Sequence, residues 1–157
     1  MTTFTTIAAA QAAGFTIGSK RRFETYRGCY IAGCDISGRS GGLQHFGYDY
    51  ALHVEVPADV NGCEYGVTDF SPNFGHTETI TLTETLNKLR QPGCYVAAFS
   101  PAAMAKARAE ARAWIDAWFD AHPEAVARVA ENERADAERA ARRDAKRQAR
   151  LAAKGLI

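Results

Sequence analysis

Residues 43–56 read LQHFGYDYALHVEV and give the clearest strand pattern in the chain. Apolar or aromatic side chains alternate with polar ones, which is the period of two that a strand with one buried face requires. The buried face is predicted to carry Phe46, Tyr48, Tyr50, Leu52, Val54 and Val56. The opposite face carries His45, Asp49, His53 and Glu55. We expect the fold to be built around this strand, which Pro57 ends.

A second strand is predicted upstream, because residues 23–36 (FETYRGCYIAGCDI) alternate in the same way. Residues 37–42 (SGRSGG) would connect it to the strand at 43–56, and two such runs joined by a Gly-rich loop are typical of an antiparallel hairpin. Further strands are predicted over residues 63–70 and 94–99. Together these runs predict a small, mainly antiparallel sheet of three to five strands.

Two short helices are predicted beside the sheet. Residues 6–13 (TIAAAQAA) can be capped by a threonine hydroxyl and ended by Gly14 in the left-handed conformation. Residues 81–84 (TLTE) have the spacing of a capping box, which predicts a second helix that Pro92 and Gly93 would stop.

A long helix is predicted to begin at Ser100, whose hydroxyl can cap it, with Pro101 in its first turn. Its apolar stripe is wide enough to cover one face of a small sheet. The stripe consists of Met104, Ala107, Ala111, Trp114, Ile115, Trp118 and Phe119.

A break is predicted around Pro123, and residues 124–154 have high helix propensity but almost no large apolar side chains. The large apolar residues beyond Pro123 are Val126, Val129, Leu151, Leu156 and Ile157. This composition predicts a compact domain over residues 1–122 and a polar, Arg- and Ala-rich helix over residues 123–157. The fold class that follows is α+β, with helices packed on one face of the sheet and a long C-terminal helical extension.

The formal net charge of +1 hides a separation along the chain. Residues 1–138 hold twelve basic and seventeen acidic side chains, a net charge of −5. Residues 139–157 hold seven basic side chains against Asp144 alone, a net charge of +6. Because charge separation reflects binding partners more than fold, it is the strongest functional signal in this sequence.

The C-terminal basic residues are the first candidate binding site. At helical spacing they gather on one side of the helix, where a row of guanidinium groups can follow phosphates and release condensed counterions. The residues are Arg139, Arg142, Arg143, Lys146, Arg147 and Arg150. Two alternatives stay open. The basic residues could simply form a solvated helix face, or their partner could be an acidic protein surface.

Lys20, Arg21, Arg22 and Arg27 form a second basic cluster, interleaved with aromatic residues as single-stranded nucleic acid would require. A half-buried strand explains the same pattern. The preceding residues are similar to a helix-turn-helix in having a helix, a Gly-centred turn and a basic second element. They depart from that motif because Thr16-Ile17-Gly18 favours a strand.

A different class of protein is the alternative: a small enzyme or metal-binding protein centred on His53, Glu55, His76 and a cysteine. Imidazole, carboxylate and thiol groups can bind a metal or transfer a proton. The cysteines, Cys29, Cys34, Cys63 and Cys94, lack metal-site spacing, so we expect reduced structural thiols, no metal and no cofactor.

The sequence therefore favours a non-catalytic binding protein, an adaptor or inhibitor, that contacts nucleic acid or a nucleoprotein complex through its basic clusters. Arg outnumbers Lys fourteen to five, which is typical of GC-rich coding and would fit a phage or plasmid accessory protein. No run approaches eighteen apolar residues, and residues 3–14 lack the positive flank of a secretory signal. We expect a cytoplasmic protein without a membrane span.

Overall fold

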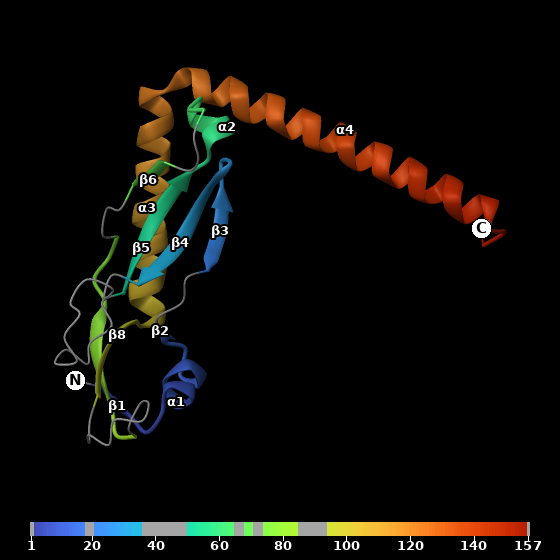
Figure 1. The fold of residues 1–157 in the computed structure, drawn as a ribbon. Helices are drawn as coiled ribbons and strands as arrows, with labels where there is room; N and C mark the ends of the chain where they lie inside the picture. Colours follow the sequence, from blue (N-terminus) through green and yellow to red (C-terminus); the bar gives the residue numbers. More distant parts are fainter. Residues whose placement is uncertain are drawn as a thin grey trace.

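The computed structural model describes residues 2–17, 21–35, 50–64, 68–70, 74–84 and 94–156. Within these ranges the chain forms eight strands, in two four-stranded sheets, and four helices. The predicted α+β class is confirmed: the sheets are mainly antiparallel, helices pack against them, and the chain ends in a long helix. Figure 1 shows this last helix leaving the rest of the molecule.

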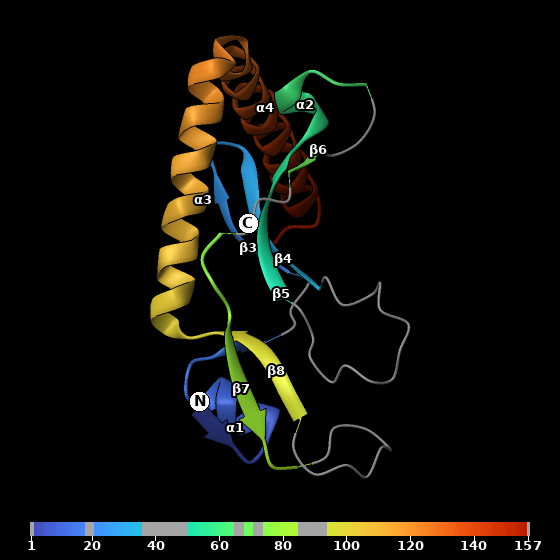
Figure 2. The ribbon, with the colours of Figure 1, turned by 90° about the vertical axis from the view of Figure 1, so that its left-hand side faces the viewer.

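The first sheet lies at the end of the molecule that holds the N-terminus (Figures 1 and 2). Its order is β1 (Thr2–Phe4), β7 (Glu78–Leu82), β8 (Cys94–Phe99) and β2 (Thr16–Ile17), with β1 parallel to β7 and the other pairs antiparallel. Helix α1 (Ile7–Ala12) packs on it through a small core that includes Ala10, Ile80 and Leu82.

The second sheet is antiparallel throughout and has the order β3 (Arg22–Tyr26), β4 (Cys29–Asp35), β5 (Tyr50–Val56) and β6 (Thr68–Phe70). Leu52, Val54 and Val56 on β5 are fully buried in the main core, as the alternation predicted. The rest of the predicted strand at 43–49 and the connector at 37–42 lie outside the described residues.

The run at 23–36 does not form a single strand. It folds into the β3–β4 hairpin, because Arg27 and Gly28 both adopt positive φ angles, 50° and 79°, as a tight two-residue turn requires. An uninterrupted strand would place Tyr26 and Tyr30 on one face, whereas in the hairpin they lie on opposite faces. A Cβ atom at position 28 would also stand 3.3 Å from a methyl group of Val129, so glycine allows the turn to approach the last helix closely.

One further expectation is corrected in the first sheet, and strands β1 and β7 and helix α2 were not predicted. The residues read as a capping box begin inside a strand, where Thr81 pairs with Tyr95 of β8. Thr16 and Ile17 form strand β2, as their departure from the helix-turn-helix motif predicted. After Pro57 a short helix, α2 (Ala58–Asn61), precedes the turn at Gly62.

Helix α3 (Pro101–Ala121) runs along one face of the second sheet, as Figure 2 shows. The Ser100 hydroxyl accepts a hydrogen bond from the Ala103 amide (3.2 Å), which is the predicted cap. Ala107, Ala111, Ile115 and Phe119 are buried against β4 and β5, which confirms the predicted apolar stripe.

Charged side chains tie the edge strand β3 to α3. Glu24 accepts hydrogen bonds from Arg112 Nε (2.6 Å) and Arg108 Nε (2.9 Å). The Tyr26 hydroxyl donates to Asp116 (3.1 Å), which raises the pKa of Tyr26. The Arg112 and Arg108 guanidinium groups hold the pKa of Glu24 below its ordinary value of 4.5, although partial burial of the carboxylate opposes them.

Glu24→Gln is expected to lower the free energy of unfolding by about 1.5 kcal/mol at neutral pH, because it removes charge-assisted hydrogen bonds to two arginines. The folded-state pKa lies below the unfolded one, so this stabilisation is complete above the unfolded pKa and is lost as the pH falls through the folded value. Urea unfolding should therefore show a difference between wild type and variant that shrinks below pH 4.5. The exposed Glu64→Gln serves as the control, and an equal loss in both variants would contradict the prediction.

Candidate nucleic-acid interface

Helix α4 (Pro123–Ala153) follows α3 after a break at His122 and Pro123, as predicted. Its first turns pack on the domain. Ala125 is fully buried, Arg128 Nη1 donates to the carbonyl oxygen of Val60 (2.8 Å), and Asn132 Nδ2 donates to the Asp59 carboxylate (3.1 Å). Together with the contact between Val129 and the hairpin turn at Gly28, these residues fix the direction in which α4 leaves the domain.

Beyond these contacts α4 projects into solvent (Figure 1). Every residue from 136 to 150 is exposed, and the predicted basic row lies in this stretch. At about 100° per residue, the six side chains fall within an arc of about 140° around the helix axis. We call them the basic row: Arg139, Arg142, Arg143, Lys146, Arg147 and Arg150.

The basic row is largely free of acidic partners. Arg139 pairs with Asp136 one turn earlier. Among the residues that the structure describes, the other five members form no ion pair. Asp144, the single acidic residue of the C-terminal segment, falls about 60° outside the arc by helical geometry. Five members of the row therefore present uncompensated positive charge to solvent.

The second predicted cluster is engaged inside the domain. Arg22 Nε lies 3.1 Å from a carboxylate oxygen of Glu55, and its guanidinium carbon lies 3.7 Å from the Tyr30 ring centre. Arg27 Nη1 lies 2.8 Å from an Asp116 oxygen.

Arg21 differs from these two arginines. It directly precedes β3, is exposed, and stacks over Phe23 at 4.8 Å without an ion pair in the described part of the chain. Lys20 lies outside the described residues. The structure thus divides the cluster into two internally paired arginines and one, Arg21, that can meet a partner.

The structure brings together only some residues of the alternative enzyme or metal site. His53 Nε2 lies 3.2 Å from Glu55 Oε1, while Arg22 holds the other oxygen of the same carboxylate. His53 itself is buried on the face of β5 that carries Glu55, and His76 is exposed in a separate segment before β7. No group of three potential metal-binding side chains occurs among the residues that can be described.

Cys29 does not form a catalytic pair with His53. Cys29 is buried in the core on the opposite face of the sheet, and burial raises the pKa of its thiol to about 11. A thiol with this pKa is protonated at neutral pH and is a poor nucleophile. Cys63 is exposed, and the side chains of Cys34 and Cys94 lie outside the part that the structure describes.

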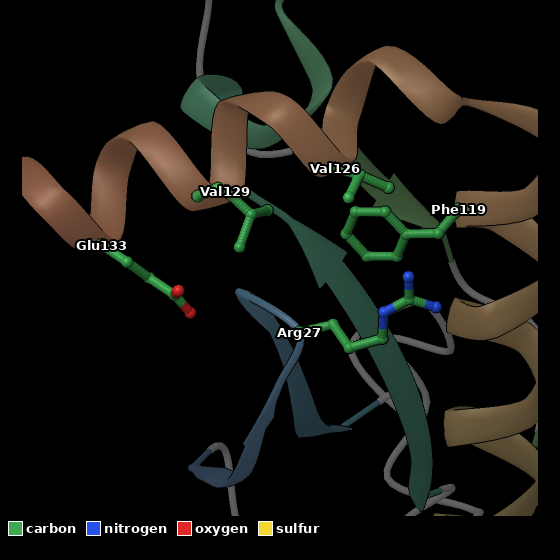
Figure 3. A pocket seen from close by; sticks show the side chains of 6 residues that line it. Arg27, Phe119, Val126, Val129 and Glu133 are labelled. Carbon is green, nitrogen blue, oxygen red and sulfur yellow. The ribbon is translucent and has the colours of Figure 1, made fainter.

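A pocket of about 240 Å³ lies in the elbow between α3, α4 and the β3–β4 turn. Figure 3 shows Val126, Val129 and Arg27 around the Phe119 ring, with Glu133 at the outer side. Arg27 covers this ring at 4.2 Å. Val126 and Glu133 lie about 100° or more around α4 from the middle of the basic row, whereas Val129, which also lines the pocket, lies in line with Arg147 at the edge of the row.

Comparisons with protein-family models, curated proteins and solved structures find no match for this chain. Within the described ranges, no helix is long and apolar enough to cross a membrane. The residues that sequence reasoning missed are those that anchor α4. Ala125, Arg128, Val129 and Asn132 have the spacing i, i+3, i+4 and i+7 of a single helix face, and this periodicity was the signal that could have found them.

Proposed function

We propose that this chain is a non-catalytic binding protein that contacts nucleic acid through the basic row of α4. The observation that supports the proposal is the exposure of the whole row on a helix that the domain holds away from itself. The residues of the basic row take no part in the core, since the buried residue of α4 is Ala125, near the start of the helix. Their charge is free to neutralise phosphates and release counterions.

The chemistry of the row favours nucleic acid over an acidic protein surface. Protein interfaces draw most of their affinity from buried aromatic and apolar anchors surrounded by polar contacts. The exposed stretch 136–150 contains arginine, lysine, alanine, glutamine and acidic residues, and no large apolar or aromatic side chain. Such a surface can bind a polyanion electrostatically but offers a protein partner little to bury.

The small domain and the projecting part of α4, which we call the arm, fit an adaptor or inhibitor. Such a protein would place its domain on a nucleic acid or a nucleoprotein complex. The Arg- and Ala-rich composition is the basis for extending this proposal to a phage or plasmid accessory protein. The alternative, catalysis centred on His53 and Glu55, has less support because the Glu55 carboxylate is already shared between His53 and Arg22.

Arg143→Gln/Arg147→Gln is expected to weaken binding to a labelled DNA duplex roughly 50-fold at 0.1 M salt, since each lost phosphate contact removes one released counterion. Lys106→Gln/Arg134→Gln is the matched control: it removes the same charge from exposed positions on α3 and on the far side of α4. Fluorescence anisotropy measures both affinities. Equal affinities for the two variants would refute the proposal, whereas selective loss in the first would support it.

A further inference from the structure

The basic row faces the same side of α4 as the residues that anchor the helix to the domain. An α-helix completes five turns in 18 residues, so positions 18 apart lie in line along its axis. The anchors Ala125, Arg128, Val129 and Asn132 are followed 18 residues later by four members of the row. These are Arg143, Lys146, Arg147 and Arg150.

The side that they share looks toward the domain. In Figure 1, α4 passes above the β3–β4 turn and continues beyond β3, the edge strand of the second sheet. From Asn132 to Ala153 the helix extends for about 32 Å at 1.5 Å per residue. The row therefore borders the angle between α4 and β3, and a ligand bound to it also meets the domain.

Three carboxylates on the domain side of this angle are paired with arginines, although residues 1–138 are acidic overall. Glu24 is paired with Arg108 and Arg112, Glu55 with Arg22, and Asp116 with Arg27. These three carboxylates, on β3, β5 and α3, are thus balanced by arginines. Arg21, at the start of β3, keeps its charge and can contact a phosphate.

Resting on the proposed function, we infer that the ligand is double-stranded DNA, which lies in the angle with α4 along its major groove and a phosphate on Arg21. The major groove admits an α-helix. The arc of about 140° places Arg142 and Arg147 toward opposite sides of the helix, where the two phosphate backbones border the groove.

Single strands and RNA duplexes fit this surface less well. Proteins that bind single strands use aromatic side chains on which bases stack, and α4 contains none. The major groove of A-form RNA is deep and narrow, so a helix cannot enter it. DNA duplex is therefore expected to bind at least about ten-fold more tightly than either competitor of the same sequence and length.

Insertions between Ala137 and Glu138 in the full chain test the geometry. Two alanines turn the row by about 200°, away from the domain, whereas four turn it by only about 40° although they lengthen the arm more. We expect the two-alanine variant to bind duplex DNA about eight-fold more weakly, the value of one lost phosphate contact at 0.1 M salt, and the four-alanine variant to bind within about two-fold of wild type. Circular dichroism checks that both insertions remain helical.

Arg21→Gln supplies the second arm of the test. This replacement should weaken duplex binding about eight-fold in the wild-type background. It should leave duplex binding by the two-alanine variant unchanged, because the row of that variant no longer faces β3. Equal binding by both insertion variants, or an equal effect of Arg21→Gln in both backgrounds, would overturn the inference while leaving the basic row as the binding site. Absence of duplex binding by the wild type would instead overturn the proposed function, and equal binding of all three nucleic acids would overturn the choice of DNA duplex.

Discussion

Deletion of residues 139–157 is expected to abolish DNA binding and to leave the domain folded. The segment carries a net charge of +6, and what remains carries −5, so the truncated chain repels a polyanion. Loss of six phosphate contacts corresponds to a fall in affinity of more than about 10⁵-fold at 0.1 M salt, beyond the range of a binding titration. The stretch 139–150 is exposed throughout and makes no core contact.

Urea unfolding followed by tryptophan fluorescence should give the truncated chain a free energy of unfolding within about 0.5 kcal/mol of wild type. A large loss of stability would show that the distal half of α4 supports the fold. Retained DNA binding by the folded, truncated chain would place the binding surface elsewhere.

Phe119→Ala is expected to lower the free energy of unfolding by about 3–5 kcal/mol, the usual cost of removing a buried phenylalanine. The side chain is only 2% exposed, and its ring lies 5.1 Å from the Trp118 ring and beneath the Arg27 guanidinium. It belongs to the core cluster that joins α3, the start of α4 and the hairpin. A loss of this size is a large fraction of the stability of an ordinary domain.

Leu156→Ala is the control for this prediction, because Leu156 is 66% exposed and its replacement should change stability by less than about 0.5 kcal/mol. Both variants can be compared by urea unfolding at neutral pH. A loss below about 1 kcal/mol for Phe119→Ala would mean that the elbow is not packed as described.

The sequence predicted the elements whose burial pattern repeats over several residues. The described part of β5 and the long helix α3 have unbroken alternation or helical periodicity, and the structure confirms both. The hairpin turn was missed because the alternating pattern of residues 23–36 continues through Arg27-Gly28 and gives no sign of an interruption there. These two residues adopt the positive φ angles of a tight turn, and this local conformation divides the run into two strands.

Strand β7 was missed for a related reason. Thr81 and Glu84 satisfy a capping pattern, but Ile80 and Leu82 also alternate, and their full burial under α1 favoured the strand. The parallel pairing of β1 with β7 joins residues about eighty positions apart, and no local pattern encodes such a contact. Tertiary packing therefore determines that both β1 and β7 are strands.

The basic row could be predicted from composition and spacing, because charge runs on a helix require no tertiary information. Its direction relative to the domain required the anchors of α4, whose role depends on Val60 and Asp59 in α2. The pairing of Arg22 and Arg27 with carboxylates also depends on tertiary contacts from β5 and α3. Structure therefore narrowed the predicted basic residues to one continuous row and Arg21.

The salt dependence of duplex binding tests the central claim most directly. Six phosphate contacts from the basic row predict that the logarithm of the association constant falls with the logarithm of salt concentration with a slope of about −5.4, and the contact inferred for Arg21 brings it to about −6.3. Replacing Arg143 and Arg147 by glutamine should reduce the magnitude of that slope by about 1.8, while the Lys106→Gln/Arg134→Gln control keeps the wild-type value. A wild-type slope near zero, or one that the Arg143/Arg147 replacement does not change, would contradict the assignment of α4 as a nucleic-acid-binding arm.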